Sequence, residues 1–173
     1  MQPVASLVAV IGNGESDPER DELAEEVGAA VVRAGYGLVC GGLGGVMEAA
    51  SRGARRAASD DHAPIVAIMP GTDKGEANPH ANIVIPTGLG YARNLLVILA
   101  ADAVVAIGGQ SGTLSEIAHA WQMGKPLCAL TATEGWAAQL AGTRLDDKHP
   151  HAVHRASSAH EVEAWLRTLA LPP

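Results

Sequence analysis

The chain has 173 residues, 12 of them basic and 19 acidic, so its net charge is −7 with neutral histidines. This length fits one domain with a sizeable core. No run of lysines and arginines is present, which argues against duplex nucleic acid as a partner. No apolar run approaches the ~20 residues of a membrane helix, and no basic segment of a signal peptide precedes the first apolar run. Cys40 and Cys128 lie in apolar runs and are expected to be buried thiols, which suits the cytoplasm.

Strand-like and helical patterns alternate along the chain. The sequence predicts strands at 6–11, 36–40, 64–69, 82–85, 103–107 and 126–130, with a short strand around His154. Helices are predicted from Ser16 to the stop at Gly35, and at 46–58, 91–101, 113–123 and 159–169, with a polar loop at 70–80. Ser16 and Glu19 form a capping box at the first helix start. The alternation predicts a single α/β domain over 1–173, a Rossmann-like doubly wound parallel sheet with helices on both faces.

Glycines gather just after the predicted strands. In a doubly wound sheet these turns share one edge, where ligands bind at the switch in strand order. The strand, glycine turn and helix around 103–116 present backbone N–H groups and a positive helix end to a phosphate. The edge is therefore predicted to bind the phosphate end of a nucleotide-like ligand. The candidate residues are Gly12, Asn13, Gly14, Gly41, Gly42, Gly44, Gly45, Gly88, Gly108, Gly109, Ser111, Gly112 and Thr113.

Arg93 lies within a turn of the predicted helix start near Tyr91. The helix macrodipole disfavours a cation there, unless an anion sits between the guanidinium and the helix end. This favours Arg93 as a ligand contact, with Asn94 adding a hydrogen bond. The alternative is a surface arginine on a helix that begins elsewhere.

Glu116 has two interpretations. Thr113 and Glu116 have the spacing of a capping box, in which the carboxylate reaches back to the Thr113 N–H. Alternatively, the carboxylate lies beside the phosphate turn and stabilises positive charge that develops on a sugar ring. Glu48 occupies a matching place after an earlier glycine turn and is expected to be a first-turn acid. His119 shares a helix face with Glu116 and is expected to pack or to lie at the surface.

Four histidines cluster loosely in the last part of the chain. Their spacing does not fit a structural zinc site, so no metal is expected. They are His149, His151, His154 and His160.

Three segments together resemble the Rossmann-like superfamily once labelled "lysine decarboxylase". They are the glycine-rich 41–48, the pair Arg93-Asn94, and 109–116, Gly-Gln-Ser-Gly-Thr-Leu-Ser-Glu. The superfamily includes the LONELY GUY cytokinin-activating phosphoribohydrolases and the molybdenum cofactor carrier proteins. The resemblance covers roughly residues 5–130. Nothing resembles a pyridoxal-phosphate lysine site, which argues against lysine decarboxylation.

The phosphoribohydrolase branch has the signature Pro-Gly-Gly-x-Gly-Thr-x-x-Glu. The resemblance implies Arg93 and Glu116 as its catalytic pair, with Gly109, Gly112 and Thr113 at the phosphate. This chain departs from that signature: Ile107 replaces the proline, one extra residue precedes Gly112, and Asn94 stands where that branch has lysine.

These departures resemble the carrier branch, as do Ala77-Asn78-Pro79 and the stretch at 86–94. That resemblance implies a homo-oligomer, dimer or tetramer, that binds a phosphorylated pterin and protects it. No cofactor is required, and the expected ligand is the molybdenum cofactor (molybdopterin) or a nucleotide. The alternative is a hydrolase that splits nucleoside 5′-monophosphates into base and ribose 5-phosphate.

Overall fold

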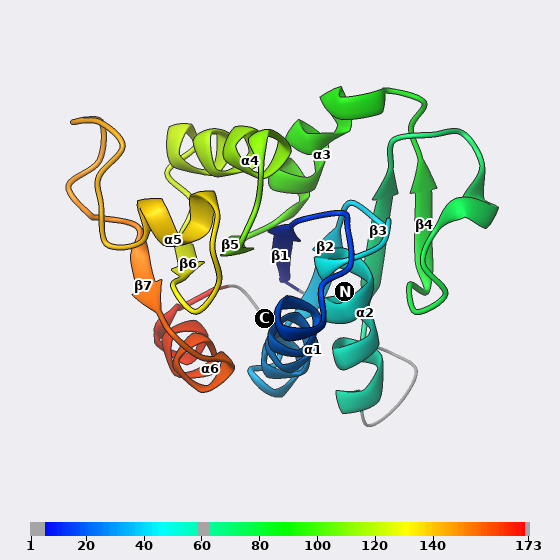
Figure 1. The fold of residues 1–173 in the computed structure, drawn as a ribbon, viewed down its shortest axis with the longest axis horizontal. Coiled ribbons are helices and arrows are strands. Elements are labelled where there is room, and N and C mark those ends of the chain that lie inside the picture. Colours follow the sequence, from blue (N-terminus) through cyan, green and yellow to red (C-terminus); the bar gives the residue numbers. More distant parts are fainter. Residues whose placement is uncertain (1–5, 59–62, 172–173) are drawn as a thin grey trace.

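The protein is described by a computed structural model that covers residues 6–58 and 63–171 (Figure 1). Within this part of the chain, the strands form one seven-stranded sheet in the order β4-β3-β2-β1-β5-β6-β7, and every neighbouring pair is parallel. The strands are β1 (Leu7–Gly12), β2 (Gly37–Cys40), β3 (Ile65–Met69), β4 (Ile83–Pro86), β5 (Ala103–Ile107), β6 (Leu127–Leu130) and β7 (His154–Ala156). The order reverses between β1 and β5, as in a Rossmann-like fold. The predicted fold class is confirmed.

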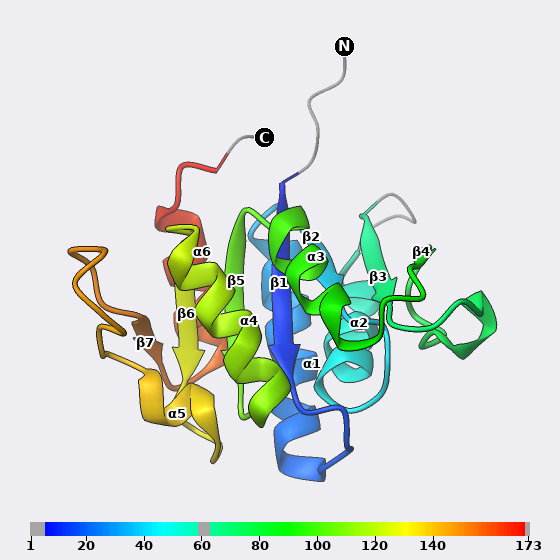
Figure 2. The same cartoon turned by 90° about the horizontal axis from the view of Figure 1, so that it is seen from above.

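Helices cover both faces of the sheet. The helices α1 (Pro18–Arg33), α2 (Val46–Ala57) and α6 (Ala159–Thr168) pack on one face, and α3 (Arg93–Ala100), α4 (Ser111–Gln122) and α5 (Trp136–Leu140) pack on the other (Figures 1 and 2). Alternate residues of each strand point to opposite faces. In β1, Val8 and Val10 join the first core, and Ala9 and Ile11 join the second.

Some element boundaries differ from the sequence prediction. The N-cap of α1 is Asp17 rather than Ser16, because the Asp17 carboxylate accepts the Arg20 N–H at 3.1 Å while the Ser16 hydroxyl donates to Asp21. The helix predicted from residue 91 begins as a short 3₁₀ turn, η2 (Gly90–Ala92), and α3 starts at Arg93. A second 3₁₀ turn, η1 (Lys74–Glu76), lies in the predicted polar loop.

The helix α5 was not predicted. It begins after Gly135, and the N–H groups of Trp136 and Ala137 donate to the carbonyls of Gly109 and Gly108 at 3.1 and 2.9 Å. These partners are distant in sequence, so no local pattern indicates them.

Two expectations from composition agree with the structure. Cys40 and Cys128 are buried free thiols, and burial raises the pKa of Cys128 to about 12. In the described residues, no helix is both long and apolar enough to cross a membrane.

The helices α1 and α2 approach each other closely because glycines occupy their crossing. A Cβ atom on Gly28 would lie 1.9 Å from the Ala50 carbonyl oxygen, and one on Gly53 would lie 1.8 Å from the Glu25 carbonyl oxygen. Real Cβ contacts never become this short, so the two backbones touch at positions that only glycine permits. This contact determines how α2, and the glycine turn before it, sit on the sheet.

We expect Gly53→Ala to lower the free energy of unfolding by about 1–3 kcal/mol, because the methyl group forces the two helices apart. Alanine's higher helix propensity, worth about 1 kcal/mol, acts in the opposite direction. Urea denaturation of the purified protein measures the difference. Gly14→Ala is the matched control, because its Cβ would meet only the Met47 Cε at 3.7 Å. A Gly53→Ala protein as stable as the wild type would contradict this account of the crossing.

Candidate ligand-binding site

A cavity of about 680 Å³ opens at the carboxyl edge of the sheet, where the strand order reverses. Its walls come from the turns after β1 and β2, from Met47 of α2, from η2 with the start of α3, and from residues 110–119 at the start of α4. Parallel sheets of this kind bind ligands in the same place, because the connections leave to opposite faces there. The predicted cleft is therefore present as a cavity.

Most of the predicted site residues line this cavity. They are Gly12, Asn13, Gly14, Gly41, Arg93, Asn94, Ser111, Gly112, Thr113 and Glu116. The remaining predicted residues lie in the neighbouring turns, outside the lining: Gly42, Gly44, Gly45, Gly88, Gly108 and Gly109. Gly42, for example, shapes the turn after β2. Its φ is 78°, and a Cβ atom there would lie 2.4 Å from the Met69 sulfur, so no side chain fits at this position.

The turns after β1 and β5 are joined directly. The Asn13 side-chain oxygen accepts the Gly109 N–H at 2.6 Å, and α5 donates to the carbonyls of Gly108 and Gly109 from the other side. The Gly109 N–H therefore already has an acceptor. The N–H groups available to a ligand are therefore those at the start of α4, and not those of the whole glycine turn.

The N-terminus of α4 has no side-chain cap. Gln110 is the N-cap residue, and its side chain makes no capping hydrogen bond. The first backbone acceptor inside the helix, Gln110 O, takes the Leu114 N–H at 2.9 Å. The N–H groups of Ser111, Gly112 and Thr113 precede this bond and have no acceptor within the helix. They lie in the cavity wall at the positive end of a twelve-residue helix.

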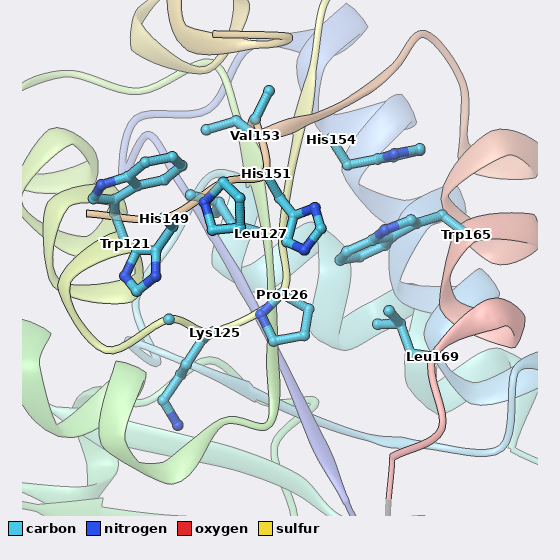
Figure 3. A pocket seen from close by; sticks show the side chains of 13 residues that line it. Trp121, Lys125, Pro126, Leu127, His149, His151, Val153, His154, Trp165 and Leu169 are labelled. Carbon is cyan, nitrogen blue, oxygen red and sulfur yellow. The ribbon is translucent and has the colours of Figure 1, made fainter. Parts of the chain in front are cut away.

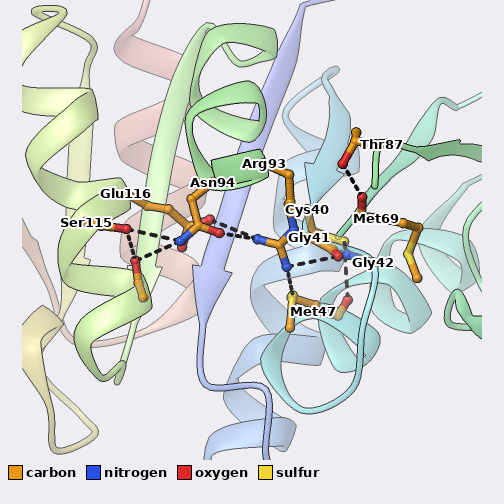
Figure 4. Close-up of polar contacts among 11 residues, drawn as sticks. Cys40, Gly41, Gly42, Met47, Met69, Thr87, Arg93, Asn94, Ser115 and Glu116 are labelled. Atoms are coloured by element: carbon orange, nitrogen blue, oxygen red, sulfur yellow. Dashed lines mark hydrogen bonds and ion pairs between the residues drawn. The ribbon is translucent and has the colours of Figure 1, made fainter. Parts of the chain in front are cut away.

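Arg93 is buried, with 7% of its surface exposed. Its Nη2 donates to the Gly41 carbonyl at 3.2 Å, its Nη1 donates to the Asn94 side-chain oxygen, and its Nε, also buried, has no partner in the described structure (Figure 4). Burial lowers the pKa of the guanidinium, and the nearby Glu116 carboxylate opposes that change. The alternative of a surface arginine is therefore wrong.

Glu116 faces Arg93 across the cavity wall. Its Oε1 lies 3.8 Å from Arg93 Nη1, and 6% of the residue is exposed. The capping-box interpretation is wrong, because α4 begins at Ser111 and Thr113 is already inside the helix. Burial raises the pKa of the Glu116 carboxyl to about 7, and the Arg93 charge opposes this rise.

Asn94 connects α3 to α4. Its side-chain nitrogen donates to the Ser115 hydroxyl at 3.1 Å and to the Gly112 carbonyl at 3.4 Å, while Ser115 itself donates to that carbonyl at 2.6 Å (Figure 4). Ser115 was not among the predicted site residues. Its place one residue before Glu116 is the signal that it shares the same part of α4.

Other lining residues were also absent from the prediction. They are Glu15, Leu43, Met47, Tyr91, Gln110 and His119, with parts of β1 and α3. His119 was expected to pack or to lie at the surface, but it lies in the cavity wall one turn beyond Glu116. Tyr91, 89% exposed, stands at the rim. Glu48 lies in the first turn of α2, as predicted.

The later histidines do not enter this cavity. His149, His151 and His154 line a second cavity, at the opposite edge of the sheet. Among the described residues, no group of three or more His, Cys, Asp or Glu side chains could hold a metal ion.

The raised pKa of the Glu116 carboxyl predicts how the stability of the protein changes with pH. Between the ordinary carboxyl pKa of 4.5 and the folded-state value of about 7, the folded protein binds more protons here than the unfolded chain. The stability that this group contributes is therefore full below pH 4.5 and is lost as the pH rises through about 7. Glu116→Gln removes this change, which amounts to at most about 3 kcal/mol.

Urea denaturation of wild type and Glu116→Gln at pH 5 and pH 8 tests this. Relative to the variant, the wild type is expected to lose stability between the two pH values. Parallel pH profiles would show that Glu116 titrates normally. Glu26→Gln on α1 is the control, because that carboxyl lies away from Arg93 and the cavity.

The sequence model of the SLOG cluster4 family matches residues 5–163. An uncharacterised protein of Archaeoglobus fulgidus is 42% identical over 123 residues, which are 71% of this chain and 78% of that protein. The molybdenum cofactor binding protein of the phototrophic bacterium Rippkaea orientalis has a similar structure, with a TM-score of 0.81 at 30% identity over 95% of this chain and 97% of its own. The molybdenum cofactor carrier protein of Chlamydomonas reinhardtii gives 0.80 at 28% identity over 95% and 98%. The protein therefore belongs to the SLOG cluster4 family, and molybdenum cofactor carrier proteins are among its structural relatives.

Proposed function

We propose that this protein is a carrier that binds the molybdenum cofactor, a phosphorylated pterin, in the cavity at the carboxyl edge of the sheet. The observation that carries the proposal is the buried Arg93, whose Nε has no partner among the residues that the structure describes, in the same cavity as the uncapped start of α4. A guanidinium and the positive end of a helix in the same cavity favour the binding of an anion. The structural relatives that bind or carry this cofactor support the identity of the ligand.

The residues present fit a phosphate at the start of α4. The N–H groups of Ser111, Gly112 and Thr113 are its donors, and Arg93 supplies charge. Gly112 fits this role in particular, because a Cβ there would meet only the Asn94 side chain, at 3.8 Å. Packing therefore does not require glycine at this position. The open space beside it is the space that a bound phosphate would occupy.

The rest of the cavity has room for a ring system. Its volume of about 680 Å³ lies within the usual range for small-molecule sites, and Leu43 and Met47 form apolar parts of the wall opposite α4. Asn13, Gly14 and Gly41 place backbone and amide groups near this region. When bound, the cofactor would bring a redox-active metal. The residues of this chain would hold its phosphate and contact its ring.

Gly112→Ala is expected to lower affinity for a molybdenum or tungsten pterin by tenfold or more, because the added methyl occupies the proposed phosphate space. It should leave stability unchanged or slightly higher, since alanine favours a helix by about 1 kcal/mol. Arg93→Gln should weaken binding by a similar factor through loss of a charge-assisted contact. Isothermal titration calorimetry measures both affinities.

Arg56→Gln is the control for that experiment, because Arg56 pairs with Glu25 on α1, away from the cavity. Affinity unaltered in both Gly112→Ala and Arg93→Gln would contradict the proposed phosphate position.

A second candidate function rests on Glu116 and Arg93. A buried carboxyl with a pKa near 7, 3.8 Å from a guanidinium, suits acid–base or electrostatic catalysis. In a nucleoside 5′-monophosphate hydrolase, the bond from the ribose C1′ to the base breaks and the base leaves with the bonding electrons and takes a proton. Water then adds to C1′, and the Glu116 carboxylate stabilises the positive sugar ring in between.

The two functions are separated by incubating the protein with a panel of nucleoside 5′-monophosphates and measuring released base by chromatography. A carrier releases no base. Release by the wild type that is lost in Glu116→Gln would overturn the carrier-only proposal. The absence of turnover, together with saturable binding of the pterin, would overturn the hydrolase.

We also propose that the protein is a homo-oligomer, a dimer or tetramer. Several large apolar side chains are exposed along β4, η2 and α3: Ile83, Ile85, Leu89, Tyr91 and Leu99. Exposed apolar side chains on neighbouring elements are typical of a contact between subunits. Light scattering coupled to size exclusion should give more than one chain per particle, and Leu99→Glu should shift it toward the monomer. A monomeric wild type would contradict this proposal.

A further inference from the structure

A second cavity, of about 660 Å³, lies at the opposite edge of the sheet. Its walls come from the segments that precede β6 and β7, together with the C-terminal ends of α4 and α6 (Figure 3). The first cavity is built instead from turns that follow strands. Because all strands are parallel, the two cavities open at opposite edges and can be filled independently.

Aromatic side chains are concentrated around this second cavity. Only 3% of the chain is aromatic, yet two of its three tryptophans, Trp121 and Trp165, line the same cavity. They come from helices on opposite faces of the sheet, and Figure 3 shows His151 between them. Aromatic and apolar walls with a few polar groups are typical of small-molecule sites.

Both indoles are held in place by their neighbours. The Trp121 Nε1 donates to Asp146 at 2.7 Å, and its ring meets His149 edge-on at 5.5 Å. Trp165 stacks on His154, with ring centres 5.4 Å apart and planes 13° from parallel. Rings that are already oriented lose little conformational entropy when a ligand binds.

Lys125 and the imidazoles of the lining histidines supply hydrogen-bond donors to the wall. Among the described residues that line it, none is acidic, and Lys125 alone is formally charged. Its ammonium donates to the Ala101 carbonyl, which leaves two of its three protons for a ligand. Two acids lie near lining residues: Asp146 accepts from the Trp121 Nε1, and Glu161, near His154, accepts from the Ser157 N–H.

We infer that this second cavity binds a small planar aromatic molecule that carries one anionic group. The ring of the ligand lies beside His151, in the space that Trp121 and Trp165 border. Its carboxylate or phosphate accepts hydrogen bonds from Lys125 and from the imidazole of His151. This site is separate from the proposed cofactor site and does not depend on it.

The test follows the three indole N–H signals of the ¹⁵N-labelled full-length protein by NMR during titration with naphthalene-2-carboxylate. Trp121 and Trp165 should shift. Trp136 should not, because it lies on α5 beside the Gly109 turn at the other edge. Cyclohexanecarboxylate, which lacks the aromatic ring, and naphthalene-2-methylammonium, which reverses the charge, should bind at least about tenfold more weakly.

Two variants examine the polar contacts. Lys125→Met should weaken naphthalene-2-carboxylate binding about tenfold, which corresponds to one charge-assisted hydrogen bond. His151→Ala, at an exposed position, should weaken it several-fold without disturbing the core. Arg93→Gln should leave the affinity unchanged, which separates this site from the first cavity.

Four results would each overturn the inference. They are shifts at Trp136 alone, equal binding of the three probes, loss of binding in Arg93→Gln, and no shift at millimolar probe.

Discussion

The pairing of β5 with β1 is the constraint on which the rest of the structure depends. The register places Gly12 opposite Ile107, so the turns that follow the two strands leave the sheet side by side. The Asn13–Gly109 hydrogen bond then joins these turns directly. Because β2 lies on the other side of β1, the chain must pass to the opposite face of the sheet before β5 begins. The space between those two paths is the cavity.

Burial of Arg93 is costly, and the fold only partly offsets the cost. A buried guanidinium needs partners for its donors and a counter-charge. Gly41 and Asn94 accept from two of its nitrogens, while Glu116 stands 3.8 Å away and its own carboxyl pKa is raised to about 7. At 3.8 Å the two groups form an ion pair but are too far apart for a hydrogen bond. An anionic ligand beside Arg93 would add to this compensation, which agrees with the proposed phosphate site.

The sequence predicted the site unevenly. Glycine turns after strands, and a strand–turn–helix segment, indicate a phosphate edge because these patterns are local. The same patterns could not separate glycines that line the cavity, such as Gly112, from those that only shape turns, such as Gly42. That difference depends on Met69, which approaches Gly42 from a neighbouring strand. Ser115 and His119 were missed for the same reason, since their neighbours across the cavity come from other parts of the chain.

The sequence by itself determined the alternation of strands and helices, the burial of the two thiols and the edge of the sheet that carries the glycine turns, because periodicity and turn chemistry act over a few residues. Only the tertiary structure decided that Glu116 is not a helix cap. Its spacing from Thr113 equally suits a helix cap, and the choice depends on where α4 begins and on a guanidinium from α3. The start of α5 and the second cavity were likewise decided by contacts between residues far apart in sequence, which local patterns do not encode.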